Sequence, residues 1–201
     1  MREVGIGRVL VASLHQGIAD ILPTRLGFYE EWLNAEGLRG GTIGAAPVSA
    51  VLSFLRQEGE AYDLITARAG RYAAEWTVEV MAPFQRTLIG AVPAWLRARI
   101  LIHLARRLVR DTCQASRAVA RMRRGTVRID LQESVFCSVR EPVRQPLCRF
   151  YAAAFERLLE LFHLDVVADI VACRGTGGSG CTVTLALSPG RSSQGDQERA
   201  A

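Results

Sequence analysis

Apolar residues recur at helical spacing through the first half of the chain. Residues 18–33 form helical pieces interrupted at Pro23, and Pro47 suits the first turn of a helix that extends to about residue 57. Over residues 62–80 apolar positions recur every three or four residues, which predicts a further helix ending before Pro83. A second break at Pro93 begins a long helix over 94–116. The cations of the following run RAVARMRRG suit the negative C-terminal end of that helix.

The pattern changes after Gly125. The segment TVRIDLQ alternates apolar and polar positions, as a half-buried strand does, and a further short strand is expected over 134–139. An amphipathic helix follows over 146–163, and the segments DVVADIVAC and CTVTLAL form a hairpin around a glycine-rich turn. Helices followed by strands predict an α+β fold with an antiparallel sheet. One face of that sheet would be covered by the helices over 94–116 and 146–163.

Length and composition favour one domain. The 201 residues, 49% of them hydrophobic, are enough for a single core, which we assign to residues 1–187. Residues 188–201 are small and polar, and are expected to form a disordered tail. The early apolar run is broken by glycines and lacks a clear cleavage site, and no run of 18 apolar residues occurs. We therefore expect a cytoplasmic protein, in which a disulfide framework among the five cysteines would be unusual.

The net charge of +5, carried entirely by arginine among the basic residues, favours anionic partners without choosing among them. No nucleic-acid-binding motif accompanies it, so we expect no nucleic-acid partner. The arginine-rich run over 117–125 allows at most peripheral contact with a membrane.

Four of the cysteines fall in the predicted α+β half with the spacing C-x10-C-x24-C-x7-C: Cys137, Cys148, Cys173 and Cys181. Cys173 and Cys181 would face each other across the mouth of the hairpin, close enough to share a zinc ion. Cys148 would begin a helix, where the pKa of a thiol falls. The spacing alone leaves two other interpretations open: small buried apolar residues, or, less favoured, an iron–sulfur site. Cys113 stands apart and is interpreted as packing.

Two late segments, REPVRQPLCRFYAAAFERLLELF and DVVADIVACRGTGGSGCTVTLAL, resemble the four-vinyl reductase domain family, in particular its bacteriochlorophyll 4-vinyl reductase members. The shared features are a Pro-Leu-Cys start to the late helix, an Ala-Ala-x-Phe-Glu-Arg-Leu segment and a Cys-x7-Cys hairpin. The upstream segment AGRYAAEWTVEVMAPFQRTLIGAVPAWLRARIL is similar as well, so that the resemblance covers about residues 17–187.

This resemblance implies a fold like that of the small subunits of the transport-particle (TRAPP) tethering complex, with an apolar ligand pocket. It also implies a homodimer, and we expect its interface to be formed by the helical residues 1–60. In relatives that sense aromatic hydrocarbons, cysteines matching Cys148, Cys173 and Cys181 form a metal site, generally of zinc. The family usually has a glutamate three residues before the cysteine that matches Cys173, and here that position is Ile170. Cys137 is the first candidate for the fourth ligand, and Asp169, two pleats from Cys173 on the same predicted strand face, is the second.

The family name implies a tetrapyrrole ligand, which would need apolar walls, a cation for its carboxylate and a ligand for its central magnesium. The candidates are Tyr72, Trp76, Phe84, Trp95, Arg99 and His103. At the same spacing the aromatic residues would equally suit a core, the arginine a solvated helix face and the histidine a buried hydrogen bond.

No nucleotide-binding motif is present, because the glycines of GTGGSG precede a strand and not a helix. We therefore favour a metal-stabilised binding protein, accessory to 4-vinyl reduction in bacteriochlorophyll synthesis and acting with a partner reductase. A genuine reductase and a hydrocarbon-sensing regulatory module are the alternatives.

Overall fold

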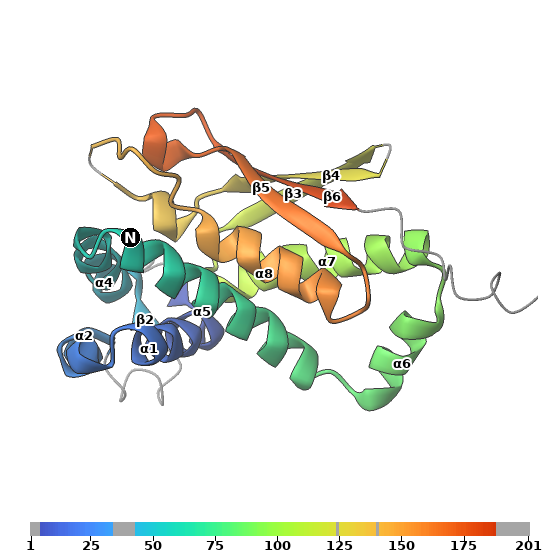
Figure 1. Ribbon diagram of the computed structural model, residues 1–201, viewed down its shortest axis with the longest axis horizontal. Helices are drawn as coiled ribbons and strands as arrows, with labels where there is room; N and C mark the ends of the chain where they lie inside the picture. Colours follow the sequence, from blue (N-terminus) through green and yellow to red (C-terminus); the bar gives the residue numbers. More distant parts are fainter. Residues whose placement is uncertain (1–4, 34–42, 124, 140, 188–201) are drawn as a thin grey trace, which may run out of the picture.

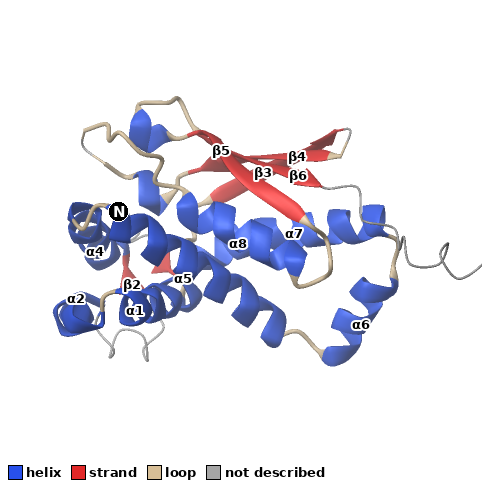
Figure 2. Ribbon diagram, viewed as in Figure 1, coloured by secondary structure: helices blue, strands red, loops and turns tan. Residues whose placement is uncertain are grey.

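The computed structural model describes residues 5–33, 43–123, 125–139 and 141–187, and it confirms the α+β class. The helices lie on one side of an antiparallel sheet, as Figures 1 and 2 show. The helices are α1 (Arg8–Ile21), α2 (Leu26–Leu33), α4 (Ala45–Gln57), α5 (Glu60–Glu79), α6 (Pro83–Ala91), α7 (Ala94–Thr112) and α8 (Arg149–Glu160). The predicted tail lies outside the described residues.

The main sheet has the strand order β3-β4-β6-β5, with every neighbouring pair antiparallel. Its strands are β3 (Arg117–Arg123), β4 (Thr126–Gln132), β5 (Val166–Ala172) and β6 (Cys181–Leu187). The strand predicted from TVRIDLQ is β4, and the predicted hairpin is β5–β6. A short pair, β1 (Gly5–Ile6) with β2 (Ile43–Gly44), lies among the N-terminal helices.

The inner face of the sheet packs on α7 and α8, as predicted. Val127 and Ile129 of β4 are completely buried, and so are their partners Leu185 and Val183 on β6. Side chains alternate along a strand, so these four residues form one apolar surface against the helices. The central strands are thereby fixed in register, because a slip of one residue would turn this surface to solvent.

Helix α5 lies at the centre of the helical layer, against α1 and α8. The contact with α8 is close: a Cβ atom at Gly70 would lie 2.2 Å from the carbonyl oxygen of Phe150. Only glycine permits this approach of two helix backbones. The N-terminus of α8, which begins just after Cys148, is therefore held at a fixed height on α5.

Two predicted elements differ from the structure. Helix α7 ends at Thr112, and the arginine-rich run that begins at Arg117 is not the end of a helix but β3, whose Ala118 and Ala120 pair with Leu131 and Ile129 of β4. The predicted strand over 134–139 is a short 3-10 helix, η2 (Val135–Cys137). Further 3-10 turns are η1 (Pro23–Arg25) and η3 (Arg174–Thr176). No helix in the described ranges combines the length and apolar character needed to cross a bilayer.

Candidate metal centre

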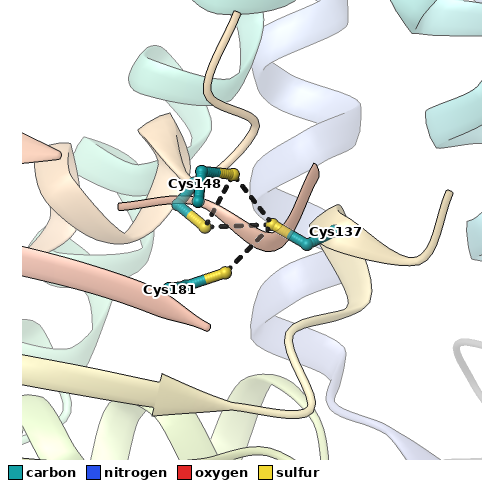
Figure 3. A group of neighbouring side chains, drawn as sticks. Cys137, Cys148 and Cys181 are labelled. Atoms are coloured by element: carbon teal, nitrogen blue, oxygen red, sulfur yellow. Dashed lines mark hydrogen bonds between the residues drawn. The ribbon is translucent and has the colours of Figure 1, made fainter. Parts of the chain in front are cut away.

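Four cysteines meet at one end of the sheet, and they come from η2, from the start of α8 and from the two ends of the β5–β6 turn. Cys137 ends η2, and Cys148 occupies the N-cap of α8, the position that the sequence predicts. Cys173 follows β5, and Cys181 is the first residue of β6. All four are buried, and their sulfur atoms lie within 4.8 Å of one another. Figure 3 shows the side chains of Cys137, Cys148 and Cys181 converging on one point.

The sulfur–sulfur distances fit a single tetrahedral ion. The Sγ atom of Cys137 lies 3.1 Å from that of Cys148, 3.4 Å from that of Cys173 and 3.3 Å from that of Cys181. Four thiolates bound to one Zn²⁺ at about 2.3 Å lie about 3.8 Å apart, so an ion would need only a small outward movement. A multi-iron cluster spreads its thiolates farther, because iron and sulfide atoms lie between them.

Two backbone amides support the hairpin sulfurs. The N–H of Leu147 donates to the Sγ of Cys173 at 3.2 Å, and the N–H of Arg174 donates to the Sγ of Cys181 at 3.3 Å. Hydrogen bonds from the Cys137, Cys148 and Cys181 thiols, together with the Leu147 amide, lower the pKa of Cys173. Hydrogen bonds with Cys137, Cys173 and Cys181, followed by burial, raise the pKa of Cys148. Four adjacent thiols cannot all ionise without a cation between them, which is the condition that a bound metal supplies.

The glycine-rich turn has a definite shape. A Cβ atom at Gly175 would lie 2.8 Å from Cδ1 of Leu147 and 3.4 Å from the Sγ of Cys173, and Gly177 adopts a positive φ of 88°. The amide of Val143 also donates to the carbonyl of Gly175 at 2.8 Å. The turn is therefore packed against the segment that precedes Cys148, and the positive φ at Gly177 favours glycine at that position.

Asp169 lies outside the cluster. Its side chain is exposed on β5, whereas Cys173 is buried. The alternation that would place both residues on one face is interrupted by a register irregularity between Ile170 and Ala172. A bulge of this kind reverses the facing of the residues after it. Cys137 therefore completes the group of four, while Cys113 is buried elsewhere as a free thiol.

The structure places the six residues predicted to bind a tetrapyrrole on α5, α6 and α7. Tyr72 and Trp76 stack on each other along α5, with ring centroids 5.5 Å apart. Phe84 and Trp95 are exposed on α6 and α7, and Arg99 lies over the Trp95 ring. His103 is exposed and lines a small cavity of about 120 Å³ beside arginines.

A larger cavity lies beside the cysteine cluster. It has a volume of about 320 Å³ and a mostly apolar lining that includes Tyr62, Val143, Leu147, Arg56 and Arg144. Its wall is continuous with the cysteine cluster, because Leu147 precedes Cys148 and its amide contacts Cys173. Sequence reasoning missed these residues. The available signal was the segment between Pro142 and Pro146, whose prolines hold the chain extended immediately before a candidate ligand.

The fold and the buried thiols together define a class: a TRAPP-like α+β domain with a possible four-cysteine metal site. No protein-family model and no curated protein matches the sequence.

Solved structures of similar fold include an Fe(II) unliganded H-NOX protein mutant from K. algicida, with a TM-score of 0.57, 12% identity, and coverage of 91% of this chain and 97% of that one. The phenol-responsive sensory domain of the transcription activator PoxR, bound to phenol, has a TM-score of 0.50 and 12% identity, and the match covers 72% of this chain and 75% of that one. A trafficking protein particle complex subunit 3 from Naegleria fowleri, covalently bound to palmitic acid, has a TM-score of 0.50 and 10% identity, and the match covers 72% of this chain and 92% of that one. These similarities establish the fold.

Proposed function

We propose that this protein binds a small hydrophobic molecule in the cavity beside the cysteine cluster, and that a structural zinc ion held by Cys137, Cys148, Cys173 and Cys181 shapes that cavity. The observation that carries the proposal is the position of Leu147, which lines the cavity and donates its amide to a thiol of the cluster. Removing the ion would release the segment before Cys148 and, with it, one wall of the cavity.

The size and lining of the cavity favour one type of ligand. A volume of about 320 Å³ lies at the lower end of the range for small-molecule sites, which is roughly 300–1,000 Å³. This volume suits a single aromatic ring or a short chain better than a macrocycle. The lining also carries charges of both signs, Arg56 and Arg144 beside Glu60 and Asp63, and these would suit a ligand with one polar or hydroxyl group. Phenol and palmitic acid, bound by proteins of similar fold, have this combination of an apolar body and one polar end.

A sensory module for such a molecule is therefore the function we favour. The second candidate is a tetrapyrrole-binding protein that assists a partner reductase in 4-vinyl reduction. A variant of this candidate is that the protein is the reductase itself. The second candidate is supported by the sequence resemblance to the four-vinyl reductase domains, but it requires a larger cavity than the one that Leu147 lines. A homodimer through the N-terminal helices is a further part of this second proposal.

The metal site is tested by measuring zinc in purified protein. We expect one zinc per chain in the wild type and in Cys113→Ser, whose thiol is buried but lies outside the cluster, and a loss of zinc in Cys173→Ser. Equal zinc in the wild type and Cys173→Ser would contradict the assignment. An intact mass lower by two hydrogens, with no metal, would indicate a disulfide instead.

The ligand site is tested by calorimetry with phenol, a fatty acid and a chlorophyllide. Val143→Trp should fill the cavity and abolish binding, whereas Val167→Trp on the exposed face of β5 should not affect it. Binding of phenol or the fatty acid that Val143→Trp removes would support the sensory module. Chlorophyllide binding alone would support the accessory role. Binding that is indifferent to Val143→Trp would reject this cavity.

A further inference from the structure

The longest stretch of the chain without a carboxylate lies in and beside α6. Residues 81–110 contain no aspartate or glutamate, although the chain has 20 acidic residues, and they contain six arginines. The segment comprises α6, the turn at Pro93 and most of α7. Figure 1 shows α6 at the opposite end of the molecule from α1, α2 and α4, between the end of α5 and the start of α7.

This acid-free segment carries large apolar side chains that protein does not cover. Phe84 is 68% exposed, Leu88 is 63% exposed and Trp95 is 62% exposed. Phe84 and Leu88 are four residues apart on α6 and therefore lie one above the other on one side of the helix. Val80, at the end of α5, is exposed as well. We call Val80, Phe84, Leu88 and Trp95 the α6 patch.

The corner that presents the patch is firmly attached to the body. The guanidinium of Arg97 donates to the carbonyls of Phe162 at 3.0 Å, Gly90 at 2.8 Å and Val92 at 3.0 Å. Ile89, on the side of α6 facing the body, is buried. The outward direction of Phe84 and Leu88 is therefore a fixed property of the fold, and no ordering of the helix is needed on binding.

The charges around the patch favour an anionic occupant. Arg86 is exposed on α6, two residues from both Phe84 and Leu88 and therefore on another side of the helix, and the guanidinium of Arg99 lies 5.7 Å from the ring centroid of Trp95. Arg110 is exposed farther along α7, while Arg107 pairs with Asp111. Glu79 is the carboxylate adjacent to Val80 at the border of the patch. Exposed aromatic and aliphatic side chains flanked by arginines are the composition of surfaces that lie in the interface of a lipid bilayer.

We propose that the α6 patch docks this protein onto the surface of a membrane containing anionic lipids. Phe84, Leu88 and Trp95 would enter the boundary between headgroups and acyl chains, where tryptophan is enriched. Arg86 and Arg99 would remain at the level of the lipid phosphates. This inference depends on neither the metal centre nor the ligand cavity.

Sedimentation with vesicles tests the proposal. We expect wild-type protein to bind vesicles of phosphatidylcholine with phosphatidylglycerol, to bind pure phosphatidylcholine weakly, and to dissociate as salt is raised. Phe84→Ser with Leu88→Ser should weaken binding by at least about tenfold, because both side chains lose their burial in lipid. The matched control is Val167→Ser with Val171→Ser, which removes two side chains of 57% and 61% exposure from the outer face of the sheet and should leave binding unchanged.

Three outcomes would overturn the proposal. The first is that wild-type protein does not bind anionic vesicles, and the second is that both double variants bind them equally. The third is that vesicles are not bound while light scattering finds a dimer that Phe84→Ser with Leu88→Ser abolishes, since a second copy would then cover the patch. A protein with Trp32 and Trp76 replaced by Phe gives an independent measurement. Its Trp95 emission should shift to shorter wavelength on anionic vesicles, and an unchanged spectrum would contradict the proposed depth.

Discussion

The hydroxyl group of Tyr62 donates a hydrogen bond to the carbonyl oxygen of Leu147 at 3.3 Å. Tyr62 lies in the first turns of α5, and Leu147 immediately precedes the metal-ligand candidate Cys148. Both residues are buried, and burial raises the pKa of the Tyr62 phenol so that it stays protonated as a donor. This bond connects the helical layer to the cluster across the floor of the proposed cavity.

Replacing Tyr62 with Phe should therefore lower stability. The Leu147 carbonyl would lose its partner in a buried position, which costs about 1–2 kcal/mol. Urea unfolding should show a lower midpoint with an unchanged slope. An unchanged midpoint would mean that the carbonyl finds another donor, such as a water molecule.

Gly70→Ala should be more damaging. The added Cβ would meet the backbone of Phe150, which cannot move without displacing α8, so we expect a loss of about 2 kcal/mol or more. Gly90→Ala is the matched control, because a Cβ atom there meets no atom within 4 Å. It should be neutral or stabilising by up to about 1 kcal/mol through helix propensity. Thermal unfolding compares the two, and equal effects would contradict the close packing of α5 and α8.

Removing the proposed zinc ion should loosen one end of the molecule only. We expect a chelator to increase hydrogen exchange in η2, in the first turn of α8 and in the turn between Cys173 and Cys181. Helix α1, which lies against α5 and contacts no ligand candidate, should keep its protection. Exchange measured by mass spectrometry separates these regions. Uniform deprotection would indicate that the whole fold depends on the ion, as in zinc fingers.

The contribution of Asp20 should depend on pH. Its carboxylate accepts hydrogen bonds from Tyr72 at 2.7 Å and Arg68 at 2.9 Å, and these bonds hold its pKa below 3.8, the usual value. A carboxyl group whose pKa is lowered by folding stabilises the protein above pH 3.8, and this contribution disappears as pH falls through the folded-state pKa.

Asp20→Asn should therefore be less stable than the wild type at pH 7 by up to about 1 kcal/mol, since the group is at the surface and screened by solvent. The difference should shrink toward zero as the acid range is reached. Denaturation midpoints at several pH values measure it. A difference that is constant with pH would assign the effect to packing and not to charge.

The sequence predicts the helices of this fold better than the segments whose conformation depends on distant residues. Proline positions and apolar spacing locate α4, α5, α7 and α8 to within a few residues, because these signals are local. Strand β3 is missed because alanine, arginine and methionine favour helices in isolation. Its conformation comes from distant residues: Ala120 pairs with Ile129, and the hydroxyl of Ser116 bonds the carbonyl of Glu133 at 2.7 Å.

The same distinction applies to the site. The four cysteines are identifiable because thiols are rare and chemically distinctive, and the structure brings them together. The six residues proposed for a tetrapyrrole are common in helices, and their spacing does not specify whether they face inward. The bulge after Ile170 also has no signal in the alternation of the strand, so Asp169 could not be separated from Cys173 by counting.

The position of Asp169 bears on aggregation. Strand β5 is an edge of the sheet, and on its outer face Asp169 lies between Val167 and Val171, both exposed. An apolar strip along an unpaired edge would invite another molecule to add a strand and begin an aggregate. The single negative charge in the middle of this strip acts as a gatekeeper, keeping the sheet from extending between molecules.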